Sequence, residues 1–130
     1  MTTTLTPESL NPEQAAAQAD ALTINEAAEV SGWSARMLRY IEQAGLVEPP
    51  RSPAGYRLYG PAELQRLRTL RELLGAYELE ISNVGFARRL REEPLLGHAV
   101  ALWLDMTPEP PAEVSDTADW LDWEQQKHKR

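Results

Sequence analysis

Cysteine is absent from this 130-residue sequence, and histidine occurs only twice, as His98 and His128. Without cysteine the chain has no disulfide bonds, no thiol nucleophile and none of the thiolate ligands that soft-metal sensors need. No run approaches the eighteen or more apolar residues of a membrane span, and the polar first six residues do not resemble a signal peptide. We therefore expect one small cytoplasmic domain with no metal site, no cofactor and no membrane partner.

Lysine is missing from residues 22–91, where all ten basic residues are arginine and the acids number eight. This block therefore carries +2, in a chain whose net charge is −7. The flanking residues 1–21 and 92–130 carry −3 and −6. The guanidinium group of arginine forms paired hydrogen bonds with phosphate and with guanine. This distribution fits nucleic-acid binding by the central block, although a solvated arginine-rich face would give the same composition.

Helix signals begin near residue 22. Thr23 and Glu26 fit a capping box, in which each side chain accepts a hydrogen bond from a free amide at a helix start. Gly32 interrupts this first helix, Ser34 is placed to cap a second, and Gly45 is suited to end it. The sequence therefore predicts two short helices joined by a tight turn.

Proline marks the next change of structure. Pro49, Pro50 and Pro53 exclude a helix from residues 47–59, which we expect to form a short β-hairpin, or wing. Pro61 suits the first position of a third helix. Leucines that recur every three or four residues predict its buried stripe: Leu64, Leu67, Leu70 and Leu74.

The chain is predicted to be mainly α-helical and to divide into four parts. Residues 1–21 are expected to be a disordered arm, or at most a frayed helix at 15–17. Residues 22–91 are expected to be a winged helix-turn-helix with flanking helices. Residues 92–106 predict a short apolar helix, and residues 107–130 a proline-containing linker and an acidic, tryptophan-bearing tail.

Five sequence blocks follow one another at characteristic spacing: TINEAA (23–28), SGWS (31–34), LRYIE (38–42), GLV (45–47) and GYRLY (55–59). Together they resemble the MerR-type regulators of bacteria, in a short form that lacks the usual effector domain. The resemblance implies that a recognition helix at about 34–44 enters the major groove of DNA and that the wing at 47–59 holds the backbone. The DNA contacts that it implies are Ser34, Arg36, Arg39, Tyr40, Arg51, Tyr56 and Arg57.

Packing roles are the alternative for some of these residues. Tyr40 and Tyr56 are also suited to the core, and Arg39 could pair with Glu42 or Glu26 instead of with phosphate. The leading hypothesis is a sequence-specific transcription regulator that binds double-stranded DNA. Two alternatives stay open: a phage-type or architectural DNA-binding factor, and a protein-interaction adaptor that uses the acidic tail. An enzyme is not expected, because no nucleophile–base pair, phosphate loop or metal-ligand cluster is visible.

Two apolar sets lie outside the central block. The first predicts either a weak homodimer contact or additional core, and comprises Leu95, Leu96, Val100, Leu102, Trp103 and Leu104. The second is Trp120, Leu121 and Trp123, which a helix would bring together on one side. Another protein, the chain's own core and its arginine-rich surface are three possible partners for these tail residues, and the sequence favours a separate protein.

Overall fold

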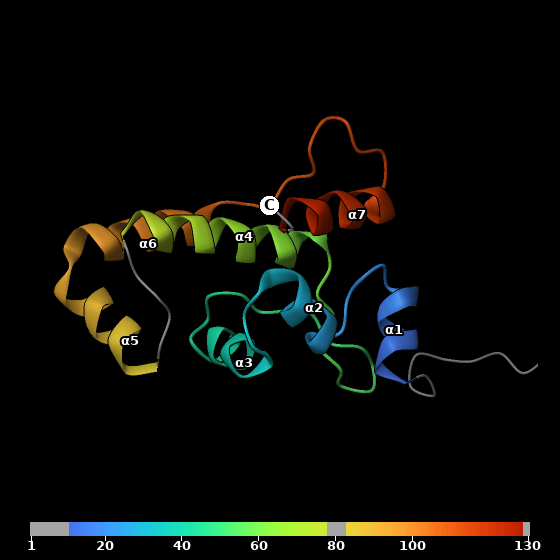
Figure 1. The fold of residues 1–130 in the computed structure, drawn as a ribbon, viewed down its shortest axis with the longest axis horizontal. Helices are drawn as coiled ribbons and strands as arrows, with labels where there is room; N and C mark the ends of the chain where they lie inside the picture. Colours follow the sequence, from blue (N-terminus) through green and yellow to red (C-terminus); the bar gives the residue numbers. More distant parts are fainter. Residues whose placement is uncertain (1–10, 78–82, 129–130) are drawn as a thin grey trace, which may run out of the picture.

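The computed structural model describes residues 11–77 and 83–128. In these ranges the chain forms seven helices, and its β-structure is limited to two isolated bridges. The helices are α1 (Pro12–Gln18), α2 (Ile24–Ser31), α3 (Ala35–Gln43), α4 (Pro61–Ala76), α5 (Asn83–Glu92), α6 (Pro94–Asp105) and α7 (Thr117–His128). Helix α4 runs across the molecule in Figure 1, with α2 and α3 below it and α7 above it. The prediction of a mainly helical chain is confirmed.

Local sequence signals set the helix ends as expected. Thr23 and Glu26 form the predicted capping box, with hydrogen bonds of 2.9 and 3.1 Å between each side chain and the other residue's backbone nitrogen. Gly32 ends α2 at a φ of 80°, and Gly45 follows α3 at a φ of 75°, in the left-handed region that glycine enters without strain. Ser34 caps α3. The helix-turn-helix geometry therefore follows from the residues at its own corners.

The leucine stripe of α4 is the centre of the core. Leu38 and Ile41 of α3 meet it in the same buried cluster as Leu96 and Val100 of α6. All four predicted leucines of the stripe are buried: Leu64, Leu67, Leu70 and Leu74. Because α3 packs against α2 and buries Leu38 and Ile41 in this shared cluster, the orientation of α3 is fixed by packing.

The predicted wing is a tight loop with little β-structure. Among the described residues, Arg51 and Arg57 form only an isolated antiparallel bridge, so the predicted two-stranded hairpin is not seen. Proline lacks the backbone N–H that a β-ladder needs, and three prolines occupy this segment. Two backbone hydrogen bonds of 2.8 Å join its sides: Ser52 N to Tyr56 O, and Leu58 N to Pro50 O.

Helix α1 lies where the sequence predicts a disordered arm. Asn11 and Gln14 form a capping box at its start, with hydrogen bonds of 2.8 and 3.1 Å. Ala15 and Ala16 are buried, because their small side chains let the helix approach its neighbours closely. The prediction of disorder is therefore wrong for these residues, and the helix is longer than the frayed turn that was the alternative. The first ten residues of the predicted arm lie outside the described ranges.

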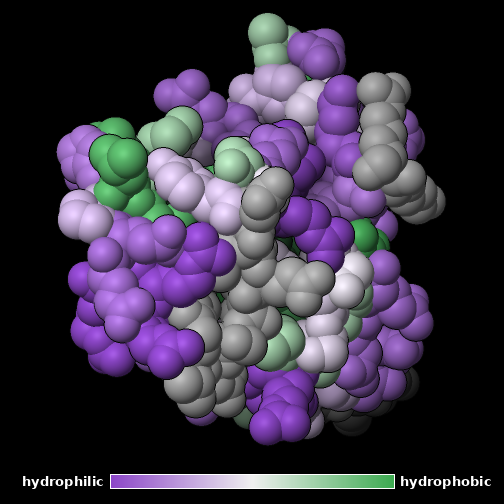
Figure 2. Space-filling view, turned by 60° about the vertical axis from the view of Figure 1, so that its left-hand side comes forward, coloured by the Kyte–Doolittle hydropathy of each residue, from purple (hydrophilic) through white to green (hydrophobic). Residues whose placement is uncertain are grey.

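The apolar set on α6 divides between two faces. Leu96, Val100 and Trp103 are buried against the body of the protein, and the indole nitrogen of Trp103 donates to Thr69 Oγ1 at 2.8 Å. Figure 2, which turns the α5–α6 end forward, shows a small hydrophobic area at the edge of a mainly hydrophilic face. The other three residues are exposed, by 76%, 55% and 39%: Leu95, Leu102 and Leu104. The first trio is core, and only the second trio is accessible to a partner.

The acidic tail folds back onto α4. Helix α7 packs along α4, and the proline-containing loop before it is also attached (Figure 1). The Gln65 side chain exchanges two hydrogen bonds, of 2.7 and 3.1 Å, with the backbone of Glu109. Arg66 Nη1 donates to Met106 O at 2.9 Å. The linker is therefore held against the body, because polar side chains of α4 bind its backbone.

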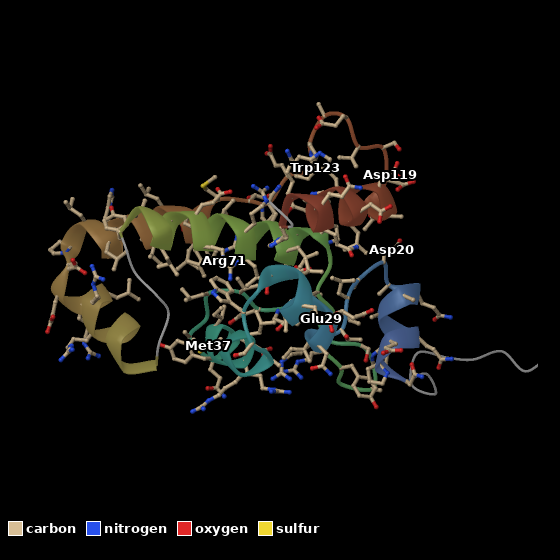
Figure 3. The ribbon with its side chains drawn as sticks, viewed as in Figure 1. Asp20, Glu29, Met37, Arg71, Asp119 and Trp123 are labelled. Carbon is tan, nitrogen blue, oxygen red and sulfur yellow. The ribbon has the colours of Figure 1, made fainter. Side chains whose placement is uncertain are left out.

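A buried ion pair anchors α7. Glu124 is fully buried, and its two oxygens each lie 3.0 Å from a nitrogen of Arg68. The Trp123 ring, labelled beside α7 in Figure 3, is faced by Arg68 at 5.6 Å and by Lys127 at 4.9 Å. Trp120 and Leu121 are half-buried. Of the three residues, Leu121 packs against the core cluster, and Trp123 lies beside Arg68 of α4.

Candidate nucleic-acid interface

Helix α3 has one buried face and one charged face. Leu38 and Ile41 are each 1% exposed, whereas Arg36 and Arg39 are open to solvent. Figure 3 labels Met37 of α3 at the lower edge of the molecule, on the side of α4 away from α7. The arginine-bearing helix therefore lies on the side of the protein opposite the acidic tail.

The polar residues near Arg36 and Arg39 have distinct environments. Ser34 Oγ accepts a hydrogen bond from Met37 N at 3.1 Å, so it acts as the N-cap of α3 while its hydroxyl proton can still be donated. Tyr40 is half-buried and packs against the core. Tyr56, at the tip of the wing loop, is 39% exposed. Core packing thus accounts for part of the Tyr40 ring, and Tyr56 remains accessible.

Glu42 binds the two predicted arginines of the wing. Arg51 Nη2 lies 3.1 Å from Glu42 Oε2, and Arg57 Nε lies 2.8 Å from Glu42 Oε1. Arg51 Nη1 also donates to Gly55 O at 3.0 Å. The alternative in which Arg39 pairs with Glu42 is not the one seen among the described residues. Instead, this carboxylate joins the end of α3 to both sides of the wing loop.

The charge of Glu42 depends on these arginines. Burial alone would raise the pKa of the Glu42 carboxyl, but the hydrogen bonds and positive charges of Arg57 and Arg51 outweigh it and hold that pKa below its ordinary value. The carboxylate is therefore ionised at neutral pH and offsets one of the two guanidinium charges.

A cleft of about 790 Å³ opens beside α3. The starts of α1 and α2, residue Arg39 and the wing residues 55–57 form its walls. Two guanidinium groups, those of Arg39 and Arg57, line the cleft together with three carboxylates, those of Glu13, Glu26 and Glu29 (Figure 3 labels Glu29). The start of α2 is already capped by Thr23 and Glu26. The cleft therefore brings Arg39 of α3 and Arg57 of the wing to one opening without an excess of positive charge.

Tyr59 fastens the wing loop to the body. It is 1% exposed, and its backbone exchanges hydrogen bonds of 2.7 and 2.9 Å with Leu22. Burial raises the pKa of the Tyr59 hydroxyl to about 12, so the phenol stays neutral. The end of the wing is therefore anchored by an uncharged, buried ring.

Sequence reasoning missed the partner of Trp33. Arg71 of α4 lies over the Trp33 ring at 5.3 Å (Figure 3 labels Arg71 below α4). A Cβ atom added to Gly32 would lie 3.0 Å from the same guanidinium group, so glycine leaves room for it. Nothing in the local sequence predicts this contact, because Trp33 lies in the turn between α2 and α3 whereas Arg71 lies on α4.

Comparison with known proteins identifies the segment that holds these residues. The model of the family described as "MerR HTH family regulatory protein" matches residues 22–84. Over these residues the chain is similar to the MerR family. The proposed DNA contacts on α3 and in the wing lie within the matched MerR-type segment, whereas α1, α6 and α7 lie outside it.

Curated relatives match part of the chain. The HTH-type transcriptional regulator HmrR of Sinorhizobium medicae is 45% identical over 51 residues, which are 38% of this chain and 35% of the relative. A probable heavy metal-dependent transcriptional regulator of Haemophilus influenzae is 39% identical over 67 residues, 51% of this chain and 46% of the relative. The HTH-type transcriptional regulator CueR of Escherichia coli O157:H7 is 38% identical over 52 residues, 39% of this chain and 38% of the relative.

The matched stretch spans between about a third and a half of the length of these relatives. Their names are those of transcription regulators, in agreement with the expectation that the chain is not an enzyme. No solved structure matches the chain significantly. None of the helices in residues 11–77 and 83–128 is both long and apolar enough to cross a membrane.

Proposed function

We propose that this protein is a sequence-specific transcription regulator that binds double-stranded DNA. One observation carries the proposal: Arg36 and Arg39 are exposed on α3, beside a cleft that Arg57 of the wing also lines. These three arginines belong to the segment that matches the MerR family.

The dimensions of α3 favour insertion into the major groove. A helix with its side chains is about 10–12 Å across and fits the major groove of B-DNA, which is about 12 Å wide, and the nine residues of α3 give it a length of about 14 Å. In this arrangement Arg36 reaches base edges and Arg39 contacts the backbone. Arg57 of the wing, at the edge of the cleft, then contacts the phosphates together with Arg39.

The remaining candidates have supporting roles in this proposal. Ser34 donates its hydroxyl proton to a phosphate at the start of α3, and the exposed Tyr56 ring lies against sugar or backbone. Tyr40 contributes mainly by packing. Arg51 is held by Glu42 and by the backbone oxygen of Gly55.

A weak homodimer is the second part of the proposal. Leu95 and Leu102 are exposed on α6 although both are large and apolar, which is typical of a contact surface. The architectural DNA-binding alternative shares the same interface and differs in sequence preference. The adaptor alternative loses support because Trp120, Leu121 and Trp123 pack partly into the protein itself.

Selection from a pool of random duplexes tests the proposal, followed by titration of the selected duplex over a range of salt concentrations. Binding should weaken steeply with salt, since each phosphate contact contributes about 0.9 to the logarithmic salt slope. Arg36→Ala should relax preference at one position by about 1–3 kcal/mol, and Arg39→Ala should weaken all duplexes alike. Salt-insensitive binding, or no enrichment of any sequence, contradicts a sequence-specific DNA reader.

A further inference from the structure

The two wing arginines, Arg51 and Arg57, differ in how many of their N–H groups remain free to bind a ligand. Both terminal nitrogens of Arg51 are used within the protein, one by Gly55 O at 3.0 Å and the other by Glu42 at 3.1 Å. In the described part of the chain, Arg57 contacts Glu42 through Nε alone, at 2.8 Å. The two terminal nitrogens of Arg57 therefore remain able to donate to a ligand.

The surroundings of the two side chains support the same division. Arg57 lines the cleft together with Arg39, and Arg51 does not. The Glu42 side chain is 17% exposed, so its contacts are shielded from water more than those of a surface ion pair. Glu42 follows the arginine-bearing part of α3 by less than one helical turn from Arg39, so the position of the wing is coupled directly to α3.

We propose that Glu42 is a positioning residue for DNA recognition, which holds Arg51 as a brace of the wing loop and directs Arg57 toward phosphate. Sequence preference then depends on Glu42 although its negative charge does not favour DNA. This inference rests on the proposed DNA-binding function. It separates two arginines that the sequence predicts to act alike.

The test compares Arg51→Ala, Arg57→Ala and Glu42→Gln on the selected duplex and on a scrambled duplex of the same composition. Arg57→Ala should lower the salt slope by about 0.9, the contribution of one phosphate contact. Arg51→Ala should leave the slope close to that of the unchanged protein, whereas Glu42→Gln, which releases Arg57 from its position, should lower the slope by up to the amount that Arg57→Ala does. Both Arg51→Ala and Glu42→Gln should reduce the preference for the selected duplex about fivefold or more, on the scale of one mismatched base pair.

Thermal unfolding of each variant gives the folding control. Arg51 is 44% exposed, so Arg51→Ala keeps the test decisive even if Glu42→Gln fails to fold. The inference is overturned if Arg51→Ala lowers the slope as much as Arg57→Ala does, or if folded Glu42→Gln keeps the full preference. Absence of salt-dependent binding in the unchanged protein would instead overturn the proposed function itself.

Discussion

Replacing Glu124 by glutamine should destabilise the whole fold, although this residue lies in the tail. Glu124 is fully buried, and both of its oxygens accept hydrogen bonds from Arg68. In Glu124→Gln an amide NH2 group replaces one oxygen, so an N–H donor of the glutamine faces an N–H donor of Arg68. Breaking a buried ion pair by removing one partner costs about 3–5 kcal/mol. The Arg68 side chain is 22% exposed and keeps part of its hydration, so we expect about 2–3 kcal/mol.

Thermal unfolding followed by circular dichroism at neutral pH measures this loss. For a chain of this size, 1 kcal/mol corresponds to a change in Tm of about 3–5 °C, so Glu124→Gln should lower Tm by about 6–15 °C. Glu72→Gln is the matched control, because Glu72 contacts the same Arg68 at 3.4 Å but is 64% exposed. The control should cost less than about 0.5 kcal/mol. Equal losses in the two variants would refute the view that a buried pair anchors α7.

Three further predictions concern pH, assembly and the cleft. Burial lowers the pKa of His128, so the unfolded chain binds a proton more readily and stability should fall as pH drops below about 6.5. His128→Gln should flatten this part of the stability–pH curve in urea titrations, and an unchanged curve would contradict it. Leu102→Glu should shift sedimentation at micromolar concentration toward the monomer, and a tight dimer that ignores it would exclude contact through α6. Glu13→Gln should tighten DNA binding about two- to threefold at low salt, because Glu13 lines the cleft, whereas Asp122→Asn on α7 should not.

The features predicted correctly from sequence are those with local causes. The capping box of Thr23, the glycines that follow α2 and α3, and the proline at the start of α4 each act on neighbouring backbone groups. The leucine stripe is equally local, because its period fixes which side of α4 is buried. These signals place α3 and expose Arg36 and Arg39 without any knowledge of distant contacts.

The errors arise where distant residues decide the structure. Glu42 binds arginines that lie 9 and 15 residues away, and Arg68 binds Glu124 across 56 residues. Any acid in the sequence is a candidate partner for any arginine, so charge patterns alone do not select these pairs. The docking of α7 depends on such a contact, whereas α1 begins at a local capping box of Asn11 and Gln14 that the sequence analysis did not use.

The net charge of −7 is compatible with DNA binding because of where the acids lie. Helix α7, whose acids contribute to that charge, lies on the other side of α4 from α3 (Figure 1). A helix with its side chains is about 10–12 Å across, and the Debye length at physiological salt is about 8 Å. A phosphate at α3 is therefore largely screened from the exposed acids of α7, while Arg36 and Arg39 act on it at contact distance. As salt is lowered toward 0.01 M the Debye length reaches about 30 Å. Repulsion between the acids of α7 and the phosphate then opposes the attraction between the phosphate and the arginines of α3. The logarithmic dependence of affinity on salt should accordingly become less steep at low ionic strength, in proportion to the acids that α7 carries.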